Sequence, residues 1–286
     1  MKIQGNTFIV TGGTGGIGGA VARSLIKSEA KVVLFDVIAN ELGEGVAAEM
    51  GGKDALYIRV DITNSDAVKG AVKKAVDTFG NLAGCVHCAG IAIKRAWSND
   101  VADSIPDFQK MLNVNTSGTF IVNAHVADAI NASRNHPEGS NEPAKYWTSN
   151  EERGIIINFA SAAAHGCYAR TLCYAPTKVA VLGITRTMSD FLGPSGIRVC
   201  SVSPSIVASA MTANFNTYFS DDLLKHATFP RVPATPDEVA ATVQYIIENK
   251  FLNGVDIPLD GGWRLVTQKP GLEGGMDPRE LAPGLE

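Results

Sequence analysis

Residues 8–25 read FIVTGGTGGIGGAVARSL, an apolar run of strand type that passes through a glycine cluster into a helical pattern. Gly12, Gly16 and Gly18 permit a tight turn and let the backbone approach a pyrophosphate group. The helix that follows would face that group with its free N–H donors and the positive end of its dipole. Because the cluster follows a strand and opens a helix, this stretch predicts a dinucleotide-binding turn at the start of a Rossmann-type sheet.

The rest of the chain repeats the alternation of strand and helix. Several strand segments are apolar nearly throughout, as expected when helices cover both faces of a sheet. The alternation predicts an α/β fold, with one domain over residues 1–263 and a doubly wound parallel sheet of about seven strands. The strand segments are 6–13, 30–36, 55–61, 82–90, 153–161, 197–204 and 254–262, and the helical ones are 17–28, 39–50, 65–79, 107–131, 173–192, 211–226 and 236–249.

Two segments interrupt this alternation. Residues 133–153 are polar, contain two prolines and lie between a helix and a strand, so we expect a surface insertion rather than a linker between domains. Residues 264–286 are rich in glycine and proline and show little periodicity, which indicates a C-terminal tail.

Composition narrows the classes of function. The chain has 286 residues, of which 45% are hydrophobic and 19% charged, as is ordinary for a soluble globular protein. A net charge of −4 gives no reason to expect nucleic acid or a membrane surface as partner. No apolar run approaches the roughly 20 residues of a membrane span, and the start of the chain resembles neither a secretory signal nor an arginine-rich presequence. We therefore expect a cytoplasmic protein.

The five cysteines do not suggest a disulfide framework in a chain of this length. Cys85 and Cys88 form a CxxC pair with His87 between them, but a metal or redox site needs further ligands or a helix N-terminus after the pair. The surrounding LAGCVHCAGI indicates instead a buried strand that ends in a glycine turn. We expect no metal.

Asp36 ends the second strand segment, 18 residues past Gly18. A carboxylate at this point accepts hydrogen bonds from both ribose hydroxyls of an adenosine and repels a 2′-phosphate. No arginine or lysine lies in the loop itself, and Val37 follows Asp36. The sequence therefore predicts NAD(H) as the cofactor, with NADP(H) disfavoured.

Tyr174 and Lys178 stand four residues apart, with Pro176 between them. On a helix the two side chains share one face, and proline is tolerated in the first turn. The stretch therefore predicts that a helix begins within a few residues of Cys173. An ammonium beside a phenol favours the phenolate and lowers its pKa from about 10. A phenolate formed in this way could accept a proton from a substrate.

Further motifs accompany this pair. They are TGGTGGIG (11–18), VDIT (60–63), HCAG (87–90), NVN (113–115) and Ser161. Together they resemble the short-chain dehydrogenase/reductase family over roughly residues 1–263, with HCAG in place of the family's NNAG. The segments 88–92, 107–120 and 246–262, with the polar insertion, most resemble the type-2 3-hydroxyacyl-CoA dehydrogenases of that family.

The resemblance implies an oxidoreductase that acts on CH–OH groups, with four catalytic residues. Tyr174 would be the base, and Lys178 would also bind the nicotinamide ribose. Ser161 would hydrogen-bond the substrate oxygen, and Asn115 would hold a water that links Lys178 to solvent. The implied cofactor-binding residues are Gly12, Thr14, Gly16, Ile17, Gly18, Asp36, Asp61, Ile62, Cys88, Ala89, Gly90, Tyr174, Lys178, Pro204, Ile206 and Val207.

The resemblance also implies a small-molecule alcohol or ketone as substrate, a mobile lid over residues 205–232 and a homotetramer or homodimer. The implied substrate pocket includes Ala163, Tyr168, Ser205 and Met211. Three positions depart from the family. Ser205 replaces the glycine that usually follows the proline, Ser209 replaces a threonine, and Tyr168 lies near an expected glutamine.

Three alternatives stay open. The same catalytic groups could serve a polycyclic or specialised-metabolite ketone instead of a 3-hydroxyacyl thioester. The chain could also be a catalytically silent cofactor-binding scaffold, although the complete catalytic set disfavours this. His165, four residues past Ser161, would allow a Ser–His hydrolase, but no G-x-S-x-G elbow surrounds Ser161.

Overall fold

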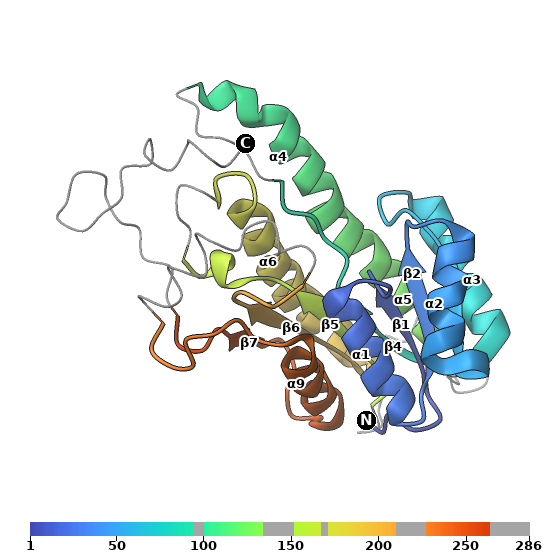
Figure 1. Ribbon diagram of the computed structural model, residues 1–286. Helices are drawn as coiled ribbons and strands as arrows, with labels where there is room; N and C mark the ends of the chain where they lie inside the picture. Colours follow the sequence, from blue (N-terminus) through green and yellow to red (C-terminus); the bar gives the residue numbers. More distant parts are fainter. Residues whose placement is uncertain (94–99, 134–151, 167–170, 210–226, 264–286) are drawn as a thin grey trace.

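A computed structural model of the chain describes residues 1–93, 100–133, 152–166, 171–209 and 227–263. Its centre is a seven-stranded sheet in the order β3-β2-β1-β4-β5-β6-β7, in which every strand pair is parallel. Helices flank both faces of the sheet (Figure 1). The predicted doubly wound fold is therefore confirmed. The predicted helix over residues 211–226, most of the predicted lid and the tail lie outside the described residues.

The elements follow the predicted segments closely. The strands are β1 (Thr7–Thr11), β2 (Lys31–Asp36), β3 (Ala55–Arg59), β4 (Leu82–His87), β5 (Gly154–Phe159), β6 (Ile197–Pro204) and β7 (Asp256–Leu259). The long helices are α1 (Gly16–Lys27), α2 (Asn40–Gly51), α3 (Ser65–Phe79), α4 (Ile105–Leu112), α5 (Thr119–Ser133), α6 (Ala175–Leu192) and α9 (Pro236–Glu248). Shorter helical segments are η1 (Gly52–Asp54), η2 (Val101–Ser104), η3 (Asn113–Gly118), η4 (Ala162–Ala164) and η6 (Gly193–Ser195).

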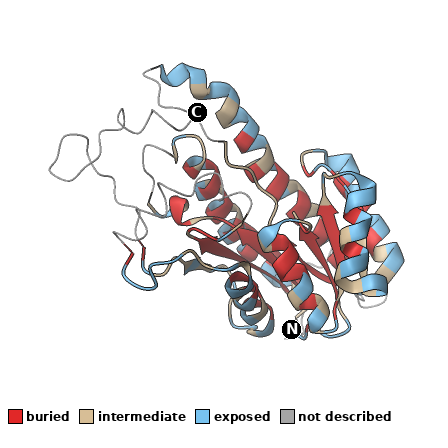
Figure 2. Ribbon diagram, viewed as in Figure 1, coloured by how far each residue is buried: buried red, intermediate tan, exposed pale blue. Residues whose placement is uncertain are grey.

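Two apolar clusters fill the space between the sheet and its helices. On one face, Val21 of α1 and Val243 of α9 pack with Val10, and on the other face Val68 of α3 packs with Ile9. Because consecutive strand residues point to opposite faces, Ile9 and Val10 of β1 enter different clusters. Figure 2 shows buried residues in the sheet and on the inward sides of the helices, with exposed residues outside. No helix among the described residues is both long and apolar enough to cross a membrane.

The winding of the chain reverses at β1. The chain runs outward through β2 and β3 and then returns to place β4 on the other side of β1. In open α/β sheets, the crevice at the carboxyl ends of such a strand pair is where ligands bind. Gly12 follows β1 and Ala89 follows β4, and a β-carbon at Gly12 would come within 3.2 Å of the Ala89 backbone. The glycine loop therefore lies at this switch point.

The helix predicted over residues 107–131 is interrupted in its middle. α4 passes into the π-helical segment η3 before α5 begins. Within η3 the Asn115 side chain is fully buried and donates to Thr177 Oγ1 of α6 at 3.1 Å. A π-helical turn changes the helix face on which a residue lies, and such turns are frequent at functional sites.

α6 begins where the spacing of tyrosine and lysine predicts. Its first residue is Ala175, directly after Tyr174, and Pro176 lies in its first turn. The N–H that proline lacks is one that the first turn of a helix leaves unpaired in any case. The predicted start of a helix near Cys173 is therefore confirmed, and Tyr174 lies one helical turn before Lys178.

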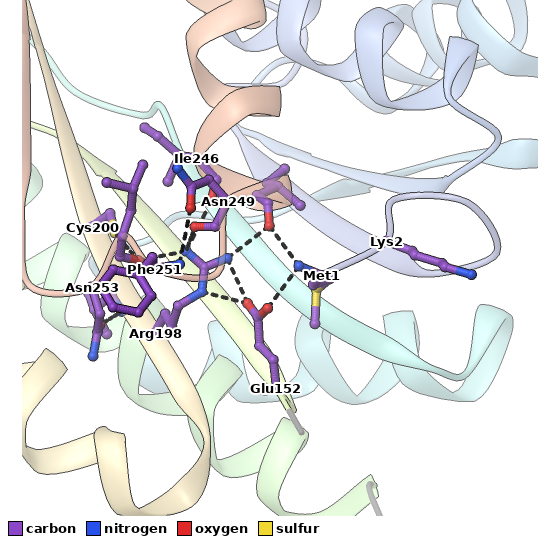
Figure 3. Close-up of polar contacts among 12 residues, drawn as sticks. Met1, Lys2, Glu152, Arg198, Cys200, Ile246, Asn249, Phe251 and Asn253 are labelled. Carbon is purple, nitrogen blue, oxygen red and sulfur yellow. Dashed lines mark hydrogen bonds and ion pairs between the residues drawn. The ribbon is translucent and has the colours of Figure 1, made fainter. Parts of the chain in front are cut away.

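A buried arginine ties β6 to the end of α9 (Figure 3). The Arg198 side chain satisfies carbonyl groups that the last turn of a helix leaves unpaired. It donates at 2.7–3.2 Å to the carbonyl groups of Ile246, Ile247, Asn249 and Leu252.

The same arginine holds the residues that precede β5. Arg198 Nε donates to Glu152 Oε1 at 2.7 Å, and Glu152 Oε2 lies 2.8 Å from the α-ammonium nitrogen of Met1 (Figure 3). The next residue, Arg153, is fully buried and donates to the Asn131 carbonyl at 3.0 Å. The sequence predicts a polar surface insertion up to residue 153, but the side chains of its last two residues are largely buried, where Glu152 accepts from cationic donors and Arg153 donates to carbonyl groups.

Candidate active site

The glycine loop has a shape that requires glycine. Gly12 has φ of +61°, in the left-handed region that other residues rarely adopt. A β-carbon at Gly18 would lie 2.2 Å from the Gly12 carbonyl oxygen, and one at Gly16 would lie 3.0 Å from Ser209 Cβ. The N-cap residue of α1 is Gly15, which has no side chain to bond the first N–H groups of the helix. These N–H groups are therefore left for a ligand. This narrow, donor-lined turn fits a pyrophosphate.

Asp36 meets the loop from the neighbouring strand. Its Oδ2 accepts from the N–H and the hydroxyl of Thr14 at 3.2 and 2.5 Å, and its Oδ1 accepts from the Val37 N–H at 2.8 Å. Arg59 ends β3 beside Asp36 and donates from Nε to the Val37 carbonyl at 3.2 Å. Arg59 is not in the loop after β2, where a basic residue would be sought from the sequence. It could be found from the rule that parallel strands end at the same edge of a sheet.

The predicted adenine-binding segment forms a turn after β3. Asp61 Oδ1 accepts from the N–H and the hydroxyl of Thr63 at 2.9 and 2.8 Å. Ile62 is buried, and a β-carbon at Gly118 of η3 would come within 2.9 Å of its Cδ1. Asp61 and Ile62 therefore lie at the same sheet edge as the glycine loop, and Ile62 supports the helical segment that carries Asn115.

A buried histidine holds the turn after β4 against the glycine loop. Thr11 Oγ1 accepts from the Ala89 N–H at 3.0 Å and lies 3.0 Å from His87 Nδ1. Burial, assisted by the positive charge of Lys178, lowers the pKa of His87 to about 3, so the imidazole is neutral. A neutral imidazole thus occupies the position where the family has asparagine, and it remains a hydrogen-bonding group.

The two cysteines of the CxxC pair do not act together. Cys85 lies within one core cluster, whereas Cys88 packs against the other. Burial raises the pKa of both thiols, which disfavours the thiolate that metal binding or redox exchange needs. The pair therefore belongs to a buried strand and its end.

Asn115 and Lys178 converge on the turn after β4. A β-carbon at Gly90 would come within 3.2 Å of Asn115 Oδ1 and 3.3 Å of Lys178 Nζ. Asn115 Oδ1 accepts from the Ile91 N–H at 2.8 Å, and its Nδ2 donates to the Ile91 carbonyl at 2.9 Å and to Thr177 Oγ1. The side chain is therefore a clamp between the turn, η3 and α6. Because both ends of the side-chain amide are engaged, the backbone carbonyl of Asn115 is the group that would bind the implied water.

The Ser161 hydroxyl lies close enough to the Tyr174 phenol to lower its pKa. Ser161 lies just past β5, and its Oγ accepts from the Ala163 N–H at 3.2 Å as the cap of η4. Tyr174 comes from the N-terminus of α6 and is half-buried. The end of a strand and the start of a helix thus bring together two residues that the sequence predicts to share one substrate oxygen.

Burial governs the protonation of Tyr174 and Lys178. Burial raises the pKa of Tyr174 to about 12, and the nearby Ser161 hydroxyl offsets only part of this rise. Lys178 Nζ donates to the Phe159 carbonyl at 2.8 Å and lies 5.7 Å from the centre of the Tyr174 ring. The pKa of Tyr174 is therefore raised in the chain by itself, where the sequence suggested a lowered one, because desolvation dominates and the Lys178 ammonium donates to a carbonyl group.

The tip of β6 forms the other side of the site. Pro204 ends the strand, and the Ser205 N–H donates to the Leu259 carbonyl at 3.0 Å. Ile206 and Val207 are buried directly after it. These predicted cofactor-binding residues therefore lie at the carboxyl end of the sheet, the same end as the glycine loop.

The predicted substrate pocket is described in part. Ala163 is buried in η4, two residues past Ser161, and Ser205 is half-buried at the tip of β6. Tyr168 and Met211 lie outside the described residues.

His165 is engaged away from Ser161. Its Nε2 lies 2.8 Å from Asp256 Oδ2 and 3.1 Å from Ser203 Oγ. A hydrolytic relay needs the acid on one ring nitrogen and the nucleophile on the other, whereas here both partners face the same nitrogen. The geometry therefore disfavours the hydrolase alternative. No sequence pattern could join His165 to Asp256, because the two are 91 positions apart.

Exchange of Lys178 for methionine is expected to stabilise the cofactor-free protein while it abolishes turnover. Because burial lowers the pKa of Lys178 from 10.5 to about 8, the charged side chain destabilises the fold at pH 7. A shift of this size corresponds to about 3 kcal/mol. Since the unfolded chain keeps the proton longer, the destabilisation fades as the pH rises from 8 toward 10.5. Urea unfolding at pH 7 and 10 should show a gain that shrinks at the higher pH.

The control for this exchange is Lys73→Met, which removes an exposed lysine paired with Asp77. It should show no comparable gain at pH 7. A Lys178→Met variant that is no more stable than the parent at pH 7 would contradict the account of a buried charge.

Known proteins share this sequence and fold. Residues 12–264 match the family model described as Enoyl-(Acyl carrier protein) reductase. The chain is 36% identical over 267 residues to a 3-hydroxyacyl-CoA dehydrogenase type-2 of Drosophila melanogaster, covering 92% of this chain and 99% of the relative. It is 32% identical over 267 residues to a (+)-cis,cis-nepetalactol synthase of Nepeta racemosa, covering 91% of this chain and 92% of the relative.

The crystal structure of a 3-hydroxyacyl-CoA dehydrogenase type-2 from Mycobacterium avium has the same fold. It matches with a TM-score of 0.78 at 28% identity, covering 92% of this chain and 98% of that one. The chain therefore belongs to the short-chain dehydrogenase/reductase family, whose enzymes act on alcohol and ketone groups with a nicotinamide cofactor.

Proposed function

We propose that this protein is an NAD-dependent dehydrogenase/reductase that interconverts a secondary alcohol and a ketone. The observation that carries the proposal is the convergence of two pairs at the carboxyl end of the sheet. The Ser161 hydroxyl faces the Tyr174 phenol, and Asn115 and Lys178 meet at the turn beside the glycine loop. When bound, the nicotinamide accepts or supplies the hydride. The residues of this chain orient the substrate oxygen and move its proton.

In this proposal Tyr174 takes the proton of the alcohol or returns it to the ketone. Ser161 places a second hydrogen-bonding group against the same oxygen and so fixes it in both directions of the reaction. With a pKa raised to about 12, Tyr174 is a phenol at neutral pH, which suits a proton donor for ketone reduction. Alcohol oxidation needs the phenolate, which a positive charge near the ring favours. Lys178 supplies one such charge at 5.7 Å from the ring centre.

Lys178 and Asn115 would carry the proton onward. Because burial lowers the pKa of Lys178 to about 8, this side chain can release a proton near neutral pH. The backbone carbonyl of Asn115 accepts from Thr119 Oγ1 at 2.6 Å, and in this proposal it also accepts from a water. A water there would connect Lys178 to solvent.

The position of Asp36 supports NAD(H) as the cofactor. Its carboxylate is fixed beside the glycine loop by Thr14 and Val37, where it would accept from the adenosine ribose and repel a 2′-phosphate. Asp36→Ala should therefore shift preference toward NADP⁺ by about 10-fold or more in kcat/KM, because the exposed Arg59 then pairs with the phosphate.

The control for Asp36 is the double variant Asp36→Ala with Arg59→Ala. Its kcat/KM with NAD⁺ should be as low as that of Asp36→Ala, but its kcat/KM with NADP⁺ should lose most of the increase. Steady-state kinetics with both cofactors measure this. A parent enzyme that prefers NADP⁺ would contradict the assignment of Asp36.

A 3-hydroxyacyl-CoA is the first substrate to consider, because the relative in Drosophila melanogaster is named for that activity. A polycyclic or specialised-metabolite ketone is the second candidate, and the nepetalactol synthase among the relatives supports it. Ser205 in place of the usual glycine, at the tip of β6, also favours a pocket that differs from that of the acyl-CoA enzymes.

Exposed apolar side chains in two regions support a homotetramer or homodimer. Phe120 of α5 and Phe191 of α6 are 53% and 81% exposed, and Tyr245 of α9 and Phe251 before β7 are 56% and 94% exposed. Aromatic side chains are enriched in the cores of protein interfaces. Light scattering on the protein as it elutes from a size-exclusion column measures the mass of the oligomer. The mass of a monomer would contradict the proposal.

The proposed function is tested by a substrate panel. The protein is mixed with NAD⁺ or NADP⁺ and a set of 3-hydroxyacyl-CoAs and alicyclic secondary alcohols, and the absorbance of the reduced cofactor is followed. We expect turnover with NAD⁺ on at least one class. Cofactor binding without turnover across the whole panel would favour a cofactor-binding scaffold.

A further inference from the structure

We propose that His165 is a positioning residue, which fixes the turn that carries Ser161 by binding Asp256 on the edge strand. The inference rests on the proposed function, in which Ser161 holds the substrate oxygen. It concerns a contact that the catalytic motifs do not include, between the segment after β5 and the first residue of β7.

Ser161 sits at the start of a tight turn, and His165 lies near its end. The Ala164 N–H donates to the Ser161 carbonyl at 2.9 Å, and the N–H groups of His165 and Gly166 donate to the Ala162 carbonyl at 3.0 and 3.1 Å. These bonds make the turn one short rigid unit. A side chain that fixes its far end therefore also limits the movement of Ser161.

Asp256 is a buried acceptor that holds the His165 end of the turn. Its side chain is only 7% exposed. Its Oδ1 accepts from Ser201 and Ser203 at 2.6 and 2.9 Å, and its Oδ2 faces His165 Nε2 at 2.8 Å. A carboxylate so far removed from water needs donors on both oxygens. His165, whose side chain is 39% exposed, supplies the donor to Oδ2.

The chemistry of the contact fixes the hydrogen on one ring nitrogen. An ionised carboxylate only accepts, so His165 Nε2 must carry the hydrogen. Both the neutral tautomer with that hydrogen and the imidazolium make the same bond. Glutamine can place an amide N–H near the position of Nε2, whereas phenylalanine fills the volume without a donor.

The contact spans the carboxyl-terminal part of the sheet. It connects the turn after β5 with Ser203 of β6 and Asp256 of β7, which are neighbours in the sheet (Figure 1). Its loss leaves the catalytic side chains in place but removes the side-chain support of their turn. Because rates fall steeply when a catalytic group is displaced by a fraction of an ångström, this loss should appear in kcat.

The test compares His165→Phe with His165→Gln, each with Ser161 intact and with Ser161→Ala, on the best alcohol of the panel with NAD⁺. We expect His165→Phe to lower kcat by about 10-fold or more, with the Kd for NAD⁺ unchanged, and His165→Gln to restore most of the loss. In the Ser161→Ala background, His165→Phe should have no further effect, since the residue through which it acts is gone. His125→Phe, which removes a similar contact with Ser65 on the outer helices, should leave kcat unchanged.

Hydrogen exchange of the amides of residues 161–166 gives a second readout that needs no turnover. These amides should exchange about 10-fold faster in His165→Phe than in the parent, and at the parent rate in His165→Gln and His125→Phe. Unchanged exchange in His165→Phe would overturn the proposal. An equal loss of kcat in the Ser161→Ala background, or no rescue by glutamine, would overturn it too.

The failure of the proposed function has a different signature. If the turn loosens in His165→Phe as expected but the parent protein oxidises no alcohol on the panel, the proposed function is wrong, and with it the catalytic role of His165. If the parent is active and His165→Phe matches it, only the positioning role is wrong.

Discussion

Tyr174→Phe is expected to lower kcat for the best secondary alcohol by about 10³-fold, while the Kd for NAD⁺ changes by less than about 3-fold. The exchange removes one hydroxyl and keeps the ring at the start of α6. The lost hydroxyl is the group that takes the substrate proton in this proposal, and it is the one that the Ser161 hydroxyl faces. The glycine loop and Asp36 remain as they are, so cofactor binding should persist. Steady-state kinetics and a binding titration with NAD⁺ measure the two effects.

The matched control is Tyr245→Phe on α9. Tyr245 is 56% exposed, and its hydroxyl accepts from Asn249 Nδ2 at 2.9 Å. Loss of this hydroxyl should leave kcat within about 2-fold of the parent, as for most exposed substitutions. A Tyr174→Phe variant that keeps more than a tenth of the parent kcat would show that another group moves the proton.

Arg198→Ala is expected to lower the free energy of unfolding by about 3–5 kcal/mol. The exchange leaves the Glu152 carboxylate without its guanidinium partner, and both side chains are at most 11% exposed. It also leaves the carbonyl groups at the end of α9 without their donor. Buried acceptors that lose their donor are costly, because no water replaces it. Urea unfolding of both proteins measures the difference.

Arg186→Ala provides the comparison, since Arg186 is exposed on the outer side of α6. Its effect should stay within about 0.5 kcal/mol. If Arg198→Ala cost less than about 1 kcal/mol, the arginine would not be the link between β6, α9 and Glu152 that its contacts indicate. Activity at low temperature should survive in Arg198→Ala, because the arginine makes no contact with Ser161 or Tyr174.

Local backbone rules account for the parts of the structure that the sequence predicts well. The glycine loop is predictable because Gly12 needs a positive φ and Gly18 has no room for a β-carbon. The start of α6 is predictable because Pro176 fits a helix in its first turn. Each strand and long helix of the described chain follows from the alternation of apolar segments with helical periodicity.

Features that depend on distant contacts or on burial could not be predicted in this way. The π-helical turn at Asn115 appears only where η3 packs against α6, and helical periodicity does not distinguish it. The raised pKa of Tyr174 follows from desolvation, whereas the spacing of Tyr174 and Lys178 suggested a lowered one. His165 and Asp256 meet only because β5, β6 and β7 are neighbours in the sheet.

Isotope transfer from substrate to cofactor tests the proposed chemistry most directly. The protein is mixed with NAD⁺ and the best alcohol of the panel, deuterated at the carbinol carbon, and the mass of the reduced cofactor is measured. We predict NADH that is heavier by one deuterium, formed by the parent protein and about 10³-fold more slowly by Tyr174→Phe. Reduced cofactor without deuterium, or equal transfer by Tyr174→Phe, would contradict hydride transfer assisted by Tyr174.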